Sequence, residues 1–429
     1  MAGMAIHPYT TINFMKQLGK YILLIISLVG ISTGERVWAQ TPDSLLQIAV
    51  ANNQELQALR LSYQAALEKA PQVSQLPNPE VGFGAFILPV ETRLGPQRAR
   101  LSLTQMFPWF GTLQAQEDWA IAEARATFER IAAYELELKY RIDNAYLVLY
   151  ELSASQRILQ ENVILLQTLK DLAETKVASG RATLADVLRL DLRLDELSQR
   201  IQLLENNKRK PQAEINQILF RDLATTVVVP DTITQALLVL DRDSLMAEVR
   251  STHPMLRMYE LQQQAAEAAI QVNTLQGRPT FGIGADYLNT GQRTDAFPEK
   301  NGRDAFQIRA TISIPLYREK YEAREREESL RIDALEARKL ETLSRFGAMI
   351  EMAFTDYEEA RLDLALYGQQ IQTIRSAIEI LEADYASQAK SFDELLQLEV
   401  SLLDYQLKQL QAIVKSHTAK AAITRYLPY

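Results

Sequence analysis

Few side chains in this sequence have the types and spacing needed for catalysis or metal binding. The chain has no Cys and three His: His7 near the start, His253 before a proline at a loop or helix start, and His417 alone in a late helix-like stretch. None is spaced for zinc, and neither a phosphate-binding loop nor a Ser/His/Asp set can be assembled. The nine Met are scattered, which does not favour a soft-metal relay. We therefore predict no catalytic residue, no metal site and no cofactor.

Acidic residues that follow two short polar turns are the remaining candidates. Asp186 follows the turn at 179–183, and Asp393 and Glu394 follow the turn at 387–391. Helix capping and the helix dipole explain such acids, at roughly 0.3–1 kcal/mol per charge. The alternative is a ring of carboxylates at a narrow mouth, which would attract cations and shift the pKa values of its members. The residues alone leave both interpretations open.

The N-terminus has the pattern of a secretory signal peptide over residues 1–39. Lys16 and Lys20 precede an apolar run at 21–31 that is shorter than the roughly 18–20 residues of a membrane-spanning helix. Small residues predict cleavage at about Ala39/Gln40, and Met15 is an alternative start. The mature chain would hold 43 basic and 53 acidic residues, which disfavours nucleic acid as a partner. Without Cys, neither a disulfide nor a lipid anchor is expected.

An internal duplication organises the rest of the chain. The stretch DSLLQIAVANNQEL from Asp43 aligns with DSLMAEVRSTHPML from Asp243, and the offset of about 200 continues through the strand-like and turn segments that follow. We predict a first repeat over 40–221, a linker over 222–242 and a second repeat over 243–429. In the first, a short helix precedes strands at about 80–90 and 98–107, a long helix at 113–178 and a helix at 183–220. In the second, a short helix precedes strands at about 280–289 and 304–314, a long helix at 317–386 and a helix at 391–425.

The strand segments alternate apolar and polar residues, most clearly in FQIRATISI at 306–314. Such alternation puts one face on something apolar and wets the other. A soluble core is one possible cover, but helices about 100 Å long cannot fold back over two hairpins, which favours lipid. Four strands cannot close a barrel in a membrane, whereas three copies would supply twelve. The polar face would then line a lumen: Arg100, Ser102, Thr104, Gln307, Arg309 and Thr311.

The two long helices contain no proline, and apolar residues recur in them every seven residues. This spacing predicts left-handed coiled-coil packing. An ordinary helical bundle explains the heptads equally well, but it does not explain strand pairs at one end of such long helices.

Aromatic residues mark the seams between strand and helix. The sequence LSLTQMFPWFG at 101–111 contains Phe107, Pro108, Trp109 and Phe110, and the second repeat has Pro315 and Tyr317 at the matching place. Aromatic side chains favour the membrane interface, and a proline suits the first turn of a helix. We predict that these residues form a membrane-exit joint, with Pro108 in the first helical turn.

The ordered set of features resembles the TolC-type outer-membrane efflux proteins over the whole mature chain. The resemblance rests on the duplication, the openings LPNPEVGFG and RPTFGIG, the seams LTQMFPWFG and TISIPLY, and the turn SGRATLADVL. INQILFRD at 215–222 also matches, although Phe220 stands where the family usually has glycine. The resemblance implies a mixed α+β membrane protein: a homotrimer with a twelve-stranded barrel in the outer membrane and a coiled-coil helical barrel in the periplasm. It also implies a periplasmic adaptor and an inner-membrane pump such as an RND transporter as partners.

The resemblance also assigns site residues by position. Glu394 falls on the first acidic position of the periplasmic gate and Gln397 on the second, where it carries no charge, so that Asp393 would have to substitute. Asp186 is a further gate candidate. The turns match the places where adaptor hairpins dock: Val177, Ser179, Gly180, Arg181, Ser387, Gln388 and Lys390.

The function implied is a passive exit duct, which moves cargo with the energy of the pump and needs no catalytic residue. The sequence QMFPWFG favours heavy-metal cations as cargo, whereas drug efflux and type I protein secretion share the architecture. A periplasmic coiled-coil scaffold and an exported hydrolase are the alternatives from other classes. The scaffold leaves the alternating strands unexplained, and the hydrolase lacks a nucleophile.

Overall fold

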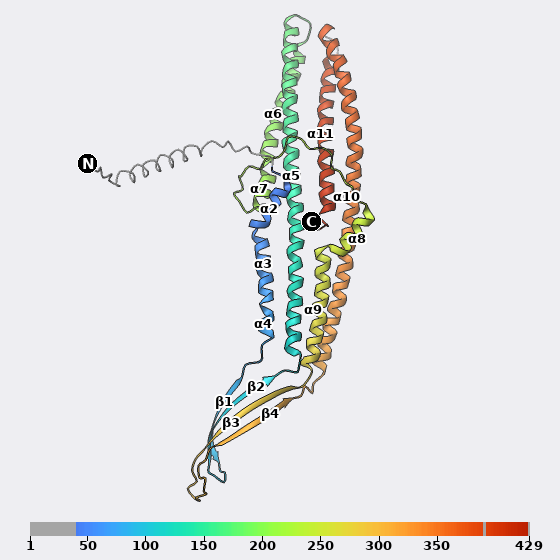
Figure 1. The fold of residues 1–429 in the computed structure, drawn as a ribbon. Helices are drawn as coiled ribbons and strands as arrows, with labels where there is room; N and C mark the ends of the chain where they lie inside the picture. The colour runs from blue at the N-terminus through green and yellow to red at the C-terminus, as the bar shows by residue number, and fades with distance from the viewer. Residues whose placement is uncertain (1–39, 389–391, 428–429) are drawn as a thin grey trace, which may run out of the picture.

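The computed structural model describes residues 40–388 and 392–427, with side chains described as far as Tyr385 before the gap. The predicted signal peptide lies outside the described residues. The molecule is long and narrow, with a four-stranded sheet at one end and paired helix tips at the other (Figure 1).

Both halves of the chain have the same order of elements. The first half contains α2 (Pro42–Asn52), α3 (Gln54–Leu67), α4 (Lys69–Val73), β1 (Glu80–Val90), β2 (Gln97–Phe107), α5 (Thr112–Ala178), α6 (Leu184–Asn207) and α7 (Arg209–Ile218). The second half contains α8 (Arg242–Thr252), α9 (Pro254–Gln276), β3 (Thr280–Thr290), β4 (Ala305–Ser313), α10 (Glu319–Gln388) and α11 (Phe392–Thr424).

The helical segment that begins each half is longer than the single short helix we expect from sequence. It is broken near its start, where in the first half Asn53 caps α3 by accepting a hydrogen bond from the backbone N–H of Leu56 at 3.1 Å. At the matching position, His253 Nδ1 accepts from the N–H of Met255 at 3.1 Å, directly before Pro254. The sequence signals for a helix start at these positions are therefore genuine, but each start lies within a helical segment that continues on both sides.

The long helices α5 and α10 run from the sheet to the tip and have 67 and 70 residues. At 1.5 Å per residue each is about 100 Å long. In the tip half, α6 packs on α5 and α11 packs on α10, and one apolar core joins the two pairs through side chains such as Leu166, Leu190, Ile378 and Leu403. The buried residues of α5 include Ile131, Leu138, Ala145, Leu159, Leu166 and Ala173, most of them seven apart, as coiled-coil packing requires.

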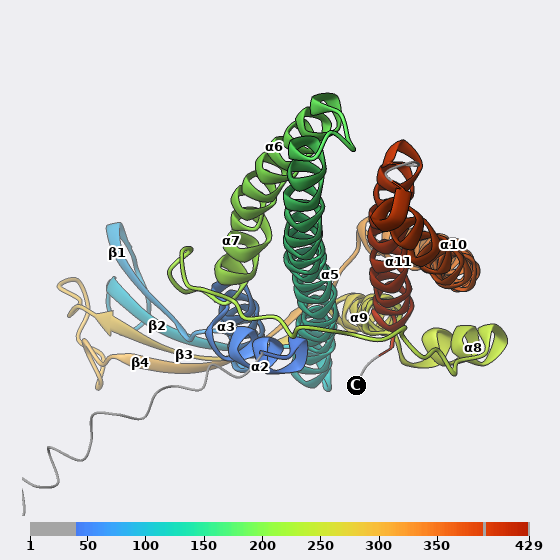
Figure 2. The same cartoon turned by 90° about the horizontal axis from the view of Figure 1, so that it is seen from above.

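In the half next to the sheet, the helices form a row in the order α3 and α4, α5, α9, α10. Seen from above, α2 and α8 lie on one side of this row, and the tips of both helix pairs lean towards the opposite side (Figure 2). The row therefore has two distinct faces, one covered by the short helices and the linker, and one on the side of the tips.

The sheet is antiparallel in the order β1-β2-β3-β4. The pairing of β2 with β3 joins the two halves, with Phe107 opposite Phe281 and Ser102 opposite Asp286. Both outer strands, β1 and β4, have one unpaired edge in the described chain.

Within the described residues, no helix combines the length and the apolar character that a membrane span requires.

Candidate functional site

The sheet has one apolar face that is exposed along its whole width in the single chain. The side chains on it come from all four strands: Val81, Phe83, Leu101, Leu103, Ile283, Tyr287, Phe306, Ile308 and Ile312. An exposed apolar patch of this extent marks a surface that meets another protein or lipid.

The opposite face of the sheet is polar, and it carries all six side chains that the sequence assigns to a lumen. Ser102 pairs in register with Asp286, and Asp286 with Gln307; Thr104 is linked through Gly284 to Arg309 in the same way. Arg100 and Thr311 lie on this face as well. The alternation of the sequence therefore gives the correct face for each of these residues.

An ion-pair cluster occupies the middle of the polar face. Asp286 has no exposed surface, and its carboxylate lies 2.9 Å from the Arg100 guanidinium and 3.8 Å from Arg309 Nε. Arg309 also donates a hydrogen bond to Thr104 Oγ1 at 2.9 Å. A Cβ at Gly284 would approach Arg309 Nη2 to 3.3 Å and the Leu103 carbonyl oxygen to 3.1 Å, so glycine leaves room for this arginine to cross the strand. Sequence reasoning missed Asp286, although it stands on the polar side of its strand between two arginine-bearing strands.

The first seam is built around a ring cluster that includes one residue from the second half. Trp109 stacks on Phe281 with ring centroids 5.8 Å apart, and Phe110 lies 6.2 Å from Trp109 and 6.5 Å from Phe281. Phe281 was not among the expected seam residues; it joins the seam because it lies opposite Phe107 in the pairing of β2 with β3.

The prediction that Pro108 occupies the first helical turn is wrong. The strand ends at Phe107 and α5 begins at Thr112. The intervening residues form a turn in which Thr112 N–H donates to the Trp109 carbonyl at 3.0 Å and Gly111 has φ of +81°. Because Gly111 adopts the left-handed conformation directly before the helix, Pro108 lies outside the helix and only ends the strand. At the second seam, Pro315 and the exposed Tyr317 lie between β4 and α10.

The first tip turn follows a hydrogen-bonding pattern that favours glycine. Gly180 has φ of +73°, its N–H donates to the Val177 carbonyl at 2.9 Å, and Arg181 N–H donates to the Lys176 carbonyl at 2.8 Å. This is the Schellman ending of a helix. The Asp186 carboxylate then accepts from Thr183 N–H at 3.0 Å at the start of α6, so Asp186 does cap this helix.

An ion pair connects the two helix pairs at the tip. Arg189 of α6 contacts the carboxylate of Asp393 of α11, and the same guanidinium lies 3.9 Å from Asp186. Asp186, Arg189 and Asp393 therefore form one charged cluster near the two turns of a single chain. Glu394 and Gln397 are exposed on α11 and do not take part in this contact.

The second tip turn is described only in part. Ser387 and Gln388 belong to the last turn of α10, and Lys390 lies outside the described residues. Within the described chain, no group of three or more His, Asp or Glu side chains could hold a metal ion.

Comparisons with known proteins agree with this architecture. Residues 45–219 match the family model described as outer membrane efflux protein. The chain is 26% identical over 428 residues to the pyoverdine export outer membrane protein OpmQ of Pseudomonas aeruginosa, an alignment that covers 88% of this chain and 84% of OpmQ.

Solved structures with the same fold include the outer-membrane channel OprN, with a TM-score of 0.71 and 21% identity, over 90% of this chain and 89% of OprN. The outer membrane protein VceC of Vibrio cholerae has a TM-score of 0.69 and 18% identity, over 90% of this chain and 96% of VceC. CusC has a TM-score of 0.70 and 14% identity, over 92% of this chain and 96% of CusC.

The family model of outer membrane efflux proteins matches the first half of the chain, and the solved outer-membrane channels share its fold over about nine-tenths of its length. The resemblance to the TolC-type proteins, drawn from the repeated motifs, is thereby confirmed, as is the mixed α+β fold class.

Proposed function

We propose that this chain is the exit duct of a tripartite efflux pump, which three copies form together in the outer membrane. The observation that carries the proposal is the open four-stranded sheet. Its apolar face is uncovered and the outer strands β1 and β4 each keep a free edge. Unpaired strand edges are not tolerated in lipid, so β4 of one copy would pair with β1 of the next until the barrel closes. Three copies give twelve strands, with the face of Arg100, Asp286 and Arg309 inside.

The helices would continue the barrel as a periplasmic tunnel that an adaptor and an inner-membrane pump engage at the tip. The turn at Val177, Ser179, Gly180 and Arg181, together with Ser387, Gln388 and Lys390, is the proposed docking place for the adaptor. Arg189 and Asp393 support a gate at the same end, since their contact holds two helix pairs together. Asp186, Glu394 and Gln397 are the neighbouring gate candidates.

The cargo is open between classes. The sequence around QMFPWFG favours heavy-metal cations, whereas OpmQ, at 26% identity, is named for pyoverdine export. Both fit a passive duct, because the pump and not the duct would supply the energy.

The proposal is tested in the membrane. Outer-membrane fractions should contain a trimer that survives unheated SDS electrophoresis and dissociates on boiling, and the purified trimer should conduct ions in a planar bilayer. A protein found as a soluble periplasmic monomer would contradict the proposal and favour the coiled-coil scaffold.

Two neighbouring substitutions give a matched control. Ile308→Arg places a charge on the apolar face at a cost of about 2–4 kcal/mol in lipid, so it should abolish the trimer. Gln307→Arg introduces the same arginine on the polar face and should leave the trimer intact. Equal effects of the two variants would exclude the assignment of the faces.

A further inference from the structure

A hollow of about 570 Å³ lies on the row of helices next to the sheet, and its lining combines alanines with basic side chains. Its charged members are Lys69, Arg130, Arg331 and Arg338, against a single carboxylate, Glu123. Ala265 and Ala266 of α9 contribute small side chains to it, and Trp119 of α5 an aromatic one. We call this hollow the basic groove.

The basic groove faces away from the short helices that cover the other side of the row. On α5, Lys139 lies 3.7 Å from Asp43 of α2, and Tyr146 Oη donates to the Gln40 carbonyl at 2.6 Å. Arg130 precedes Lys139 by nine residues, which places it about 180° around the helix. It therefore lies on the face of α5 opposite to α2. Figure 2 shows the tips of both helix pairs leaning away from α2, towards the side that would be the interior of the tunnel in the proposed assembly.

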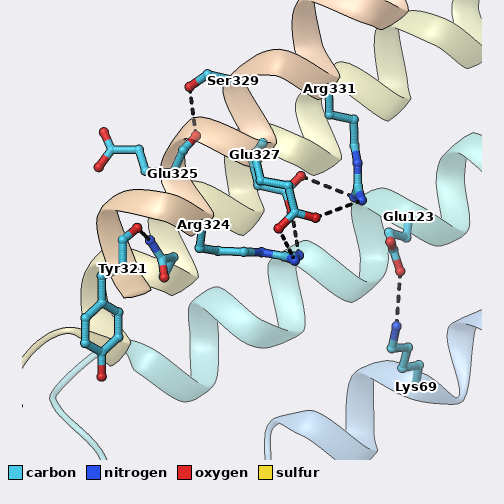
Figure 3. Close-up of polar contacts among 10 residues, drawn as sticks. Lys69, Glu123, Tyr321, Arg324, Glu325, Glu327, Ser329 and Arg331 are labelled. Atoms are coloured by element: carbon cyan, nitrogen blue, oxygen red, sulfur yellow. Dashed lines mark hydrogen bonds and ion pairs between the residues drawn. The ribbon is translucent and has the colours of Figure 1, made fainter. Parts of the chain in front are cut away.

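On α10 the basic residues form a regular stripe. Arg324, Arg331, Arg338 and Arg345 follow one another at intervals of seven, so they lie along one side of the helix over about 30 Å. Glu328, which has no exposed surface, lies 2.5 Å from Arg324 and 3.2 Å from Arg331 and holds both in place. Figure 3 shows both arginines directed towards the carboxylate of the neighbouring Glu327. Glu327 adds contacts of 3.0 and 3.7 Å to the same two arginines.

The charges do not cancel within the groove. Glu123 is occupied by Lys69 at 3.1 Å, and Glu327 and Glu328 by Arg324 and Arg331. Arg130 and Arg338 are exposed and have no carboxylate partner in the part of the chain that the structure describes. Guanidinium groups present planar sets of donors that suit carboxylate, phosphate and sulfonate oxygens.

We propose that the basic groove is a binding station for anionic groups of the cargo, so that the tunnel favours organic anions or anionic metal complexes over free metal cations. Only the claim that the bound anions are transported cargo rests on the proposed channel function. The groove is built by one chain, and its ligand preference can be measured on the purified protein whatever its assembly. In a closed trimer three grooves would face one lumen, where low-dielectric walls strengthen the field.

Binding of pyrenetetrasulfonate, a fluorescent tetra-anion, to the purified mature protein tests the proposal by anisotropy, with the cationic dye rhodamine 6G for comparison. We expect the anion to bind and its affinity to fall with salt, since screening sets in at about 10 Å in 0.1 M salt. The variant Arg130→Glu/Arg338→Glu should weaken binding by roughly tenfold or more. It removes no ion pair among the residues that the structure describes.

Arg125→Glu is the control for charge reversal. Arg125 is exposed on the same helix, five residues before Arg130 and hence about 140° around it. Its substitution should leave binding within about twofold of the wild type, because the residue points away from the groove. Unchanged binding in the Arg130→Glu/Arg338→Glu variant, or equal binding of the two dyes to the wild type, would overturn the proposal.

A second measurement reads the groove directly. Trp119 lines it, with Lys69 Nζ 4.3 Å from the ring centroid. Trp38 lies in the predicted signal peptide, so Trp109→Phe leaves Trp119 as the one tryptophan of the mature chain. Iodide should quench this tryptophan more strongly than caesium, and Arg130→Glu/Arg338→Glu should reverse the order. If caesium quenches Trp119 as strongly as iodide in the protein that keeps Arg130 and Arg338, the groove is not positive. A conducting trimer with that result would leave the channel function standing and refute the inference alone.

Discussion

At the scale of single residues, the buried carboxylate of Glu399 is the clearest departure from an apolar core. Glu399 is 2% exposed and lies between Leu395 and Leu402 on α11, in the core of the tip half. Its Oε2 is buried without a hydrogen-bond partner in the described chain. Burial, with a smaller contribution from the nearby Glu382, raises the pKa of Glu399 from 4.5 to about 7.

This pKa makes the stability of the tip half depend on pH. Between pH 4.5 and 7 the folded protein keeps a proton that the unfolded chain has lost, so the free energy of unfolding falls as pH rises through this window and then stays low. Glu399→Gln is neutral at every pH. We expect it to match the wild type at pH 4 and to be more stable at pH 8, by about 3 kcal/mol at most.

Thermal unfolding of both proteins at a series of pH values checks this expectation. Glu394→Gln, which changes an exposed carboxylate on the same helix, is the control and should follow the wild type. Parallel pH profiles for wild type and Glu399→Gln would show that Glu399 is not protonated in the folded protein.

At the scale of elements, two helix ends use one motif with different residues. After α5, Gly180 takes the left-handed position; after α7, Phe220 takes it, with φ of +51°. Phe220 N–H donates to the Gln217 carbonyl at 3.2 Å and Arg221 N–H to the Asn216 carbonyl at 3.1 Å, so the Schellman pattern is complete in both places. Phe220 stands where the family usually has glycine, and the backbone keeps the conformation that glycine would adopt.

Replacing Phe220 by Gly should therefore stabilise the protein. The left-handed conformation costs an L-residue about 1–2 kcal/mol, and Phe220 is largely exposed, so little packing is lost. We expect a net gain of about 1 kcal/mol in urea unfolding of the solubilised protein, after the greater entropy of glycine in the unfolded chain is subtracted. Phe220→Ala keeps the strain and should show no such gain; a gain of the same size in Phe220→Ala would point to the loss of the exposed ring instead.

The elements were predictable where the periodicity of the sequence is strong. The heptads in the long helices and the alternation in FQIRATISI arise because one face of each element is apolar. Such a face can be recognised from a short stretch of sequence alone. The seam and the charged clusters were less predictable, because they join residues about 180 to 200 positions apart. Phe281 completes the Trp109 cluster from the other half, and Asp286 meets Arg100 across strands. Glu399 follows Phe392 by seven residues, so its heptad position did indicate burial. A carboxylate is normally expected at the surface, however, and only the packing shows that this one is buried.

At the scale of the whole molecule, the two helix pairs form two arms, α5 with α6 and α10 with α11, which share an apolar core and also meet near the tip. The Arg189–Asp393 contact ties α6 of the first arm to α11 of the second. Both side chains are at least half exposed, so one such pair contributes well under 1 kcal/mol. In the proposed trimer the contact occurs three times around one axis, and the closed state would gain from all three at once.

Asp393→Asn should therefore loosen the closed tip without unfolding the protein. If each of three pairs contributes about 0.5 kcal/mol, their combined loss shifts the balance of closed and open states by roughly tenfold towards the open state. Single-channel recording in a planar bilayer would register this as a higher open fraction or a larger mean conductance. Asp404→Asn is the control, because Asp404 pairs with Lys408 at 2.7 Å within α11 and ties no arms together. A conductance that rises equally in both variants would assign the effect to the charge of the lumen, and one that rises in neither would remove Asp393 from the gate.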